Sequence, residues 1–213
     1  MRVALYLVAA YLIGSFPTAY LLGRWRGGVD LRQVGSGNVG GSNLRRTVGL
    51  WATVVVGVFD IAKGALPLWL GLRLGVGEVV AYTAGFVAVV GHNWPVWLGF
   101  RGGRGGACTL GILVVVFPLG VLWTLALMGV GAIAWGVAPF HLIGILTVPL
   151  LTAWIGGPAA LTWLCVALGL LMVVKRLEAN RHFAFPSKDG SGTGRRAGSA
   201  VLAARLLYDR DAM

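Results

Sequence analysis

Charged residues are scarce in this sequence, and acidic residues are the scarcest of them. Charged residues make up 12% of the 213, and 7 Asp and Glu stand against 18 Lys and Arg, for a net charge of +11. Soluble domains carry about 25% charged residues, so the composition excludes an ordinary soluble domain. Hydrophobic residues make up 57% of the chain, and the mean hydropathy is +0.81. The sequence therefore predicts an integral membrane protein.

The small number of cysteines and carboxylates also excludes several kinds of site. The two cysteines, Cys108 and Cys165, form neither a metal-binding pattern nor a disulfide framework. A magnesium-dependent phosphotransferase needs carboxylates to hold its metal. The arginines flank apolar segments, which fits cytoplasmic loops and anionic lipid headgroups better than nucleic acid. We expect no metal, no cofactor and no nucleic-acid partner, and we expect contact with membrane lipids.

Long apolar segments predict an all-α bundle of membrane-spanning helices. One span needs about 20 apolar residues, and single spans are expected at 3–22, 48–72, 79–98, 142–155 and 159–174. The segment 107–138 is too long for one span, so we expect two short spans that break near Pro118. The first segment could be a signal peptide, but it is long for one and arginines follow it directly.

Basic clusters predict how these spans are oriented. Arginines and lysines gather in 23–47, in 91–106 and in 175–181, and basic loops stay in the cytoplasm. Seven spans place all three clusters on that side, with the N-terminus outside and the C-terminus in the cytoplasm. Residues 1–181 then form the membrane domain, and residues 182–213 form a basic cytoplasmic tail that is partly disordered.

Two glycine-rich loops fall on the expected cytoplasmic side. Residues 34–43 read Val-Gly-Ser-Gly-Asn-Val-Gly-Gly-Ser-Asn, and a second glycine-rich segment spans 91–106. Successive backbone N–H groups in such loops can form a concave nest for phosphate, although a flexible connection has a similar composition. With the neighbouring arginines, the loops predict a site for a strongly anionic substrate.

Two ionisable residues lie inside the second apolar segment. Asp60 and Lys63 are three positions apart and share one face of a helix. Charged groups within a span are costly, so they are usually paired or functional. We predict that they form an ion pair with each other in preference to acting directly in catalysis. In the first apolar segment, Pro17 predicts a kink.

Four motifs follow one another along the chain. They are Gly14-Ser15-Phe16-Pro17-Thr18-Ala19-Tyr20-Leu21-Leu22-Gly23-Arg24, then Gly35-Ser36-Gly37-Asn38-Val39-Gly40-Gly41-Ser42-Asn43, then Asp60-Ile61-Ala62-Lys63-Gly64, and finally Gly91-His92-Asn93-Trp94-Pro95 with Gly102-Gly103-Arg104-Gly105. In order and spacing they resemble the motifs of the acyl-phosphate:glycerol-3-phosphate acyltransferases, the PlsY family. The resemblance covers about residues 3–181.

This resemblance implies a seven-helix enzyme of the bacterial inner membrane with its active site facing the cytoplasm. It implies transfer of a fatty acyl group from acyl phosphate to the 1-hydroxyl of sn-glycerol 3-phosphate, giving lysophosphatidic acid and phosphate for phospholipid biosynthesis. It implies catalytic roles for Ser36, Asn38, Arg45, Arg104 and Asn180. It implies phosphate-binding roles for Gly35, Gly37, Gly40, Gly41, Ser42, Asn43, His92, Gly103 and Gly105. We also expect structural or secondary roles for Ser15, Arg24, Asp60, Lys63 and His141.

The sequence departs from the family pattern at three places. Gly41-Ser42 replaces the Ala-Thr of the GATN loop, Arg104 replaces the lysine of GGKG, and Leu177 replaces the histidine of the final HRxN-type motif. His141 is a candidate to contact the acceptor instead, because the topology puts it at the cytoplasmic end of a neighbouring span. A transporter or channel for a phosphorylated solute, or a non-catalytic paralogue, is the alternative function. We find no internal repeat of the kind that many transporters contain.

Overall fold

The computed structural model describes residues 1–134 and 136–178, and these residues form helices and loops without a β-strand. Asn180 and the predicted tail lie outside the described residues. The helices are α1 Arg2–Ser15, α2 Thr18–Gly27, α3 Gly41–Thr47, α4 Leu50–Arg73, α5 Glu78–Asn93, the 3₁₀-helix η1 Val96–Leu98, α6 Gly106–Val116, α7 Pro118–Ala134, α8 Val137–Trp154 and α9 Ala159–Glu178.

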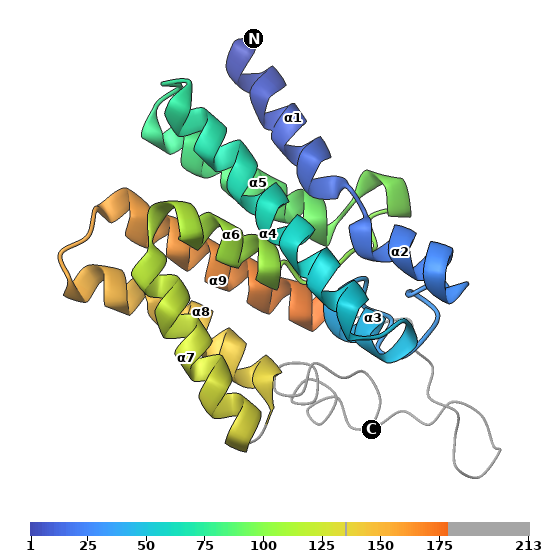
Figure 1. The fold of residues 1–213 in the computed structure, drawn as a ribbon. Coiled ribbons are helices and arrows are strands. Elements are labelled where there is room, and N and C mark those ends of the chain that lie inside the picture. The colour runs from blue at the N-terminus through green and yellow to red at the C-terminus, as the bar shows by residue number, and fades with distance from the viewer. Residues whose placement is uncertain (135, 179–213) are drawn as a thin grey trace.

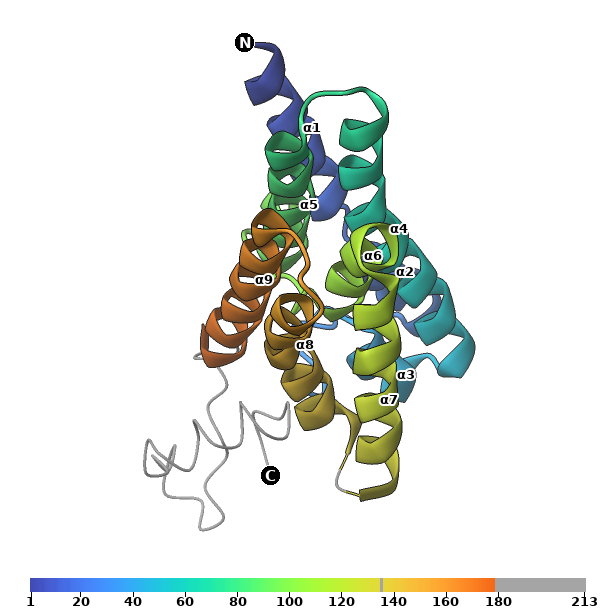
Figure 2. The same cartoon turned by 90° about the vertical axis from the view of Figure 1, so that its left-hand side faces the viewer.

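The helices pack into an elongated bundle (Figure 1). In the view turned by 90°, the N-terminus and the α4–α5 turn lie at one end, while α3 and the α7–α8 turn lie at the other (Figure 2). Four helical stretches are long and apolar enough to cross a membrane, namely Arg2–Gly27, α4, α8 and α9. This confirms an all-helical membrane protein, whereas the count of seven spans remains a prediction.

The predicted kink at Pro17 is confirmed as a break between α1 and α2. Phe16 is extended, with φ −60° and ψ 118°, and the chain becomes helical again at Thr18. Proline has no N–H to donate and cannot continue the hydrogen-bond ladder of α1. Lys63 of α4 donates from Nζ to the Phe16 carbonyl at 2.9 Å. This bond satisfies a backbone carbonyl at the break between α1 and α2.

The predicted break near Pro118 is also confirmed, because Phe117 separates α6 from α7. At 1.5 Å per residue, the 11 residues of α6 span only about 16 Å. That is about half of the hydrocarbon thickness of a bilayer, so α6 is shorter than a complete span. The third predicted span ends early: α5 stops at Asn93 instead of residue 98, since Pro95 disfavours helical backbone at Trp94.

Close backbone contacts bring α4 against α6. A Cβ atom at Gly64 would overlap the Cys108 carbonyl, and one at Gly111 would overlap the Ile61 carbonyl. Small residues let helices in membranes approach until their backbones touch. The contact places Asp60, on α4, beside the first turns of α6.

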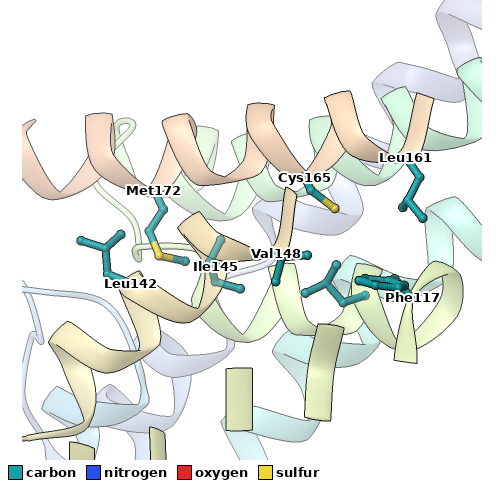
Figure 3. Packing of buried hydrophobic residues seen from close by; sticks show 8 residues of the cluster. Phe117, Leu142, Ile145, Val148, Leu161, Cys165 and Met172 are labelled. Atoms are coloured by element: carbon teal, nitrogen blue, oxygen red, sulfur yellow. The ribbon is translucent and has the colours of Figure 1, made fainter. Parts of the chain in front are cut away.

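A buried apolar cluster holds α8 against α9. Figure 3 shows side chains that interdigitate between these helices and the α6–α7 corner, among them Phe117, Leu142, Ile145, Val148, Leu161, Cys165 and Met172. Lipid tails are as apolar as these side chains, so dispersion contacts from tight packing stabilise the pair. The packing fixes the start of α8 and the end of α9, which lie near the two glycine-rich loops.

Candidate active site

One cavity lies where the two glycine-rich loops meet the ends of α8 and α9. It encloses about 1040 Å³ of empty space, part of it open to solvent. The predicted site residues that line it are Asn38, Gly40, Gly41, Ser42, Asp60, His92, Arg104, Gly105 and His141. Its remaining wall is largely apolar and includes Val56, Leu110, Met128, Val137 and Met172. The cavity therefore joins a polar, cationic part to an apolar part.

The first glycine-rich loop is built around the side chain of Asn43, which is 2% exposed. Its Nδ2 donates to the carbonyls of Leu31 at 3.0 Å, Val34 at 2.9 Å and Asn38 at 3.1 Å, and its Oδ1 accepts from the Ser36 N–H at 3.3 Å. Both amide N–H groups are thus used within the loop. Asn43 therefore shapes the loop through its side chain, and a phosphate contact from this residue stays a prediction.

Several predicted residues of this loop lie away from the cavity wall. Gly35 and Gly37 have φ of +58° and +66°, a backbone conformation that favours glycine, and they form the turn over Asn43. Ser36 lies between them, and Arg45 is exposed on α3. The structure therefore brings the far half of the loop, from Asn38 to Ser42, to the cavity.

The second glycine-rich loop ends in the N-terminus of α6. Gly105 has φ +74° and precedes the helix, and its carbonyl accepts the first helical bond, from the Thr109 N–H at 2.8 Å. The backbone N–H groups in the first turn of α6 have no partner within the helix, and the helix dipole makes the N-terminus of α6 positive. Gly106 and Ala107 line the cavity beside Arg104, which is only 8% exposed. This end of the cavity suits an anion.

Asp60, Lys63 and His92 separate the main cavity from a smaller one. Asp60 Oδ1 lies 2.8 Å from Lys63 Nζ and 3.7 Å from His92 Nδ1. The predicted ion pair between Asp60 and Lys63 is therefore present. The smaller cavity encloses about 220 Å³, and Ser15, Lys63 and Gly103 are in its wall. Arg24, the remaining predicted residue, is exposed on α2.

Three side chains in this region offer atoms that could ligate a metal. One atom each from Asp60, His92 and Cys108 lies within 4.8 Å of the others. The Lys63 ammonium, at 2.8 Å from Asp60, already occupies the position that a cation would take beside the carboxylate. The side chains present therefore do not favour a metal, and its absence from the mechanism stays a prediction.

Arg176 is a cavity residue of the basic cluster 175–181 that was not included among the predicted site residues. It is 3% exposed, lines the cavity and donates from Nη2 to the Ala138 carbonyl at 2.9 Å. It ties the end of α9 to the first turn of α8, and it lies within electrostatic range of Arg104 and His141. A basic residue in the last turn of an apolar helix was the available signal.

The chain is similar to known proteins along most of its length. The family model of glycerol-3-phosphate acyltransferase matches residues 4–184. Glycerol-3-phosphate acyltransferase 4 of Dehalococcoides mccartyi strain CBDB1 is 38% identical over 213 residues, which cover 95% of this chain and 87% of the relative. The enzyme of Symbiobacterium thermophilum is 36% identical over 191 residues, covering 87% and 92% of the two chains.

The fold is similar to solved structures as well. The crystal structure of PlsY, an integral membrane glycerol 3-phosphate acyltransferase, in its glycerol 3-phosphate form superposes with a TM-score of 0.76 at 28% identity, over 95% of this chain and 99% of that one. Its lysophosphatidic acid form gives a TM-score of 0.74. The chain belongs to the PlsY family of integral membrane glycerol-3-phosphate acyltransferases.

Proposed function

We propose that this protein moves a fatty acyl group from acyl phosphate to the 1-hydroxyl of sn-glycerol 3-phosphate, releasing lysophosphatidic acid and phosphate. The observation that carries the proposal is the composition of the cavity. Arg104, Arg176 and the α6 N-terminus gather positive charge at one part, while Leu110 and Met172 belong to an apolar wall. An acyl phosphate has the same two parts, an anionic head and an apolar chain.

The chemistry requires positioning and charge stabilisation more than a protein nucleophile. The hydroxyl oxygen attacks the acyl carbon, the bond from that carbon to the phosphate oxygen breaks, and the leaving phosphate takes the hydroxyl proton. Charge grows on the leaving phosphate, where arginines and backbone N–H groups stabilise it. Holding both substrates side by side supplies much of the remaining rate increase.

The predicted residues divide into roles that follow their positions. Arg104, Asn38 and Ser42 line the cavity, and we assign them to direct substrate contact. Ser36 and Asn43 hold the loop in shape. Arg45 is exposed on α3, where it would attract anionic substrates from the cytoplasm. Asn180, to which the family resemblance gives a catalytic role, is assigned to orienting the glycerol part.

The same proposal includes the orientation and location of the protein. Seven spans, an outer N-terminus and a cytoplasmic C-terminus would put the cavity on the cytoplasmic side of a bacterial inner membrane. The arrangement of the basic loops supports this, because both lie around the cavity at one end of the bundle. A cysteine placed in 190–194 should resist an impermeant reagent in intact cells, and labelling from outside would contradict the topology.

The function is tested by incubating purified protein with acyl phosphate and labelled glycerol 3-phosphate. We expect labelled lysophosphatidic acid, with little product when acyl-CoA replaces acyl phosphate and no loss of rate in a metal chelator. Equal rates from acyl-CoA, or complete loss in chelator, would contradict the proposal. Uptake of labelled glycerol 3-phosphate into proteoliposomes without acyl donor would favour the transporter instead.

A further inference from the structure

His141 occupies a place in the cavity that no step of the proposed reaction uses. It is the fifth residue of α8, and Val137 and Ala138 in the first turn of that helix also line the cavity. The Arg176 bond to the Ala138 carbonyl ties this turn to α9. The position of the imidazole is therefore fixed from two helices.

The imidazole lies directly against the first residue of α6. A Cβ atom at Gly106 would overlap His141 Cε1, and would lie 3.2 Å from Nδ1 and 3.5 Å from Nε2. Cε1 sits between the two ring nitrogens, so the nitrogen-bearing edge of the ring faces the N-terminus of α6. Glycine at this position leaves room for that contact.

His141 Nε2 is buried and has no hydrogen-bond partner among the described residues. A buried polar atom without a partner is costly, and natural proteins rarely keep one without a use. Because the ring lines the cavity beside N–H groups that also lack intrahelical partners, a bound ligand can supply acceptors to both.

We propose that His141 Nε2 and the first-turn N–H groups of α6 form a subsite for a phosphate group, which makes His141 a substrate-binding residue of this chain. Arg104 and Arg176 border the subsite and add positive charge. Asp60 is the one carboxylate among the described residues that line the cavity, and Lys63 compensates it. A phosphate has enough acceptor oxygens for the ring, the helix N-terminus and a guanidinium together.

The inference rests on the proposed function for the origin of the phosphate. The group belongs either to glycerol 3-phosphate or to the acyl phosphate and its product, inorganic phosphate. The two sources share their chemistry, and kinetics distinguish them. If the acceptor's phosphate binds here, loss of His141 raises KM for glycerol 3-phosphate; if the donor's binds here, it raises KM for acyl phosphate and Ki for inorganic phosphate.

Three substitutions at one position form the test. In His141→Gln, the side-chain amide nitrogen can reach the place of Nε2 and keep a donor there. In His141→Asn, the amide nitrogen reaches only the place of Nδ1, and in His141→Leu no donor remains. Ile143→Ala, on the same helix but 45% exposed, is the matched control that should behave like wild type.

We expect KM for one substrate to rise about tenfold in the Asn and Leu variants, the effect of losing one hydrogen bond to a charged group. The Gln variant should stay within about threefold of wild type on the same scale. Equal effects of Gln, Asn and Leu, or no effect of any, would overturn the subsite. If the Leu variant does not fold, the comparison of Gln with Asn decides.

A second measurement separates this inference from the proposed function. Thermal unfolding of the purified protein is followed with and without inorganic phosphate, which needs no turnover. Stabilisation of wild type and His141→Gln, but not of His141→Asn, supports the subsite even if no lysophosphatidic acid forms. Equal stabilisation of all three proteins, or of none, contradicts it even if the acyltransferase reaction is found.

Discussion

The two glycine-rich loops have similar compositions but different tasks. In the first loop, a buried asparagine uses its amide within the loop, bonding three carbonyls and one N–H. In the second, Arg104 and the start of α6 line the cavity. The first loop is thus largely a scaffold that presents one edge, whereas the second presents both charge and backbone donors to the substrate.

The difference arises from the helix to which each loop is joined. The first loop leads into α3, which has seven residues and whose arginines Arg45 and Arg46 are exposed. The second leads into α6, which has 11 residues and is packed backbone to backbone against α4. A helix that is fixed within the bundle holds its N-terminus in place, and pre-placed donors cost no reorganisation during the reaction.

The largest effect that tests this comparison is expected from arginine replacement. Arg104→Ala should lower kcat/KM by about tenfold to a hundredfold, because it removes a charge-assisted bond in a buried site. Arg104→Lys should fall between wild type and the alanine variant, since lysine keeps the charge without the bidentate geometry.

Arg45→Ala is the matched control for that measurement. Its side chain is exposed, so the loss in kcat/KM should stay below about threefold and shrink as salt is added. Steady-state kinetics at two ionic strengths would check both arginines. Similar losses for the two variants would mean that the loops do not differ as the structure indicates.

A smaller effect, on stability, is expected from Asn43→Ala. The change leaves three loop carbonyls without their donor, which should cost about 2–3 kcal/mol of unfolding free energy. Ser42→Ala, next to it on the cavity side, should change KM for a substrate and leave the free energy of unfolding within about 0.5 kcal/mol of wild type. Thermal unfolding and steady-state kinetics of both variants distinguish a residue that holds the loop in shape from one that contacts substrate. A loss of stability in Ser42→Ala together with a change of KM alone in Asn43→Ala would contradict this assignment.

The sequence was sufficient to predict most features that depend on local pattern. The apolar segments, the break at Pro17, the break near Pro118 and the Asp60–Lys63 pair all follow from spacing and from the chemistry of proline and of buried charge. The motif resemblance also identified the correct family. These features need no knowledge of which segments lie side by side.

The sequence was insufficient where a role depends on three-dimensional neighbours. A glycine-rich stretch does not reveal that the Asn43 side chain points into its own loop and bonds three of its carbonyls. Arg176 looked like other basic residues near a helix end until the structure placed it beside Ala138. His141 was a candidate through topology alone. The sequence does not reveal that its ring lies against Gly106, because that contact depends on how α8 and α6 lie in three dimensions.

The smallest expected effect concerns how the first loop is tied to the rest of the bundle. Arg32 Nη2 lies 2.6 Å from Asp30 Oδ2, and Arg32 Nη1 donates to the Leu98 carbonyl at 3.4 Å, which joins the loop to η1. The hydrogen bond from Arg32 holds the pKa of the Asp30 carboxyl below its usual value. A lowered pKa in the folded state means that ionised Asp30 stabilises the fold above the pKa of the unfolded chain, about 4.

This stability should be lost as the pH falls through the lowered pKa of the folded state. Asp30→Asn should therefore destabilise the loop by less than about 1 kcal/mol at pH 7, because the pair lies near the surface, and the difference should shrink as the pH falls below about 4 and the wild-type carboxyl protonates. Hydrogen exchange of residues 29–40 across this pH range is the measurement. Glu78→Gln, which removes a carboxylate at the start of α5, is the matched control and should leave these amides unchanged. A difference that grows on acidification would show that Asp30 does not anchor the scaffold loop through its ionised form.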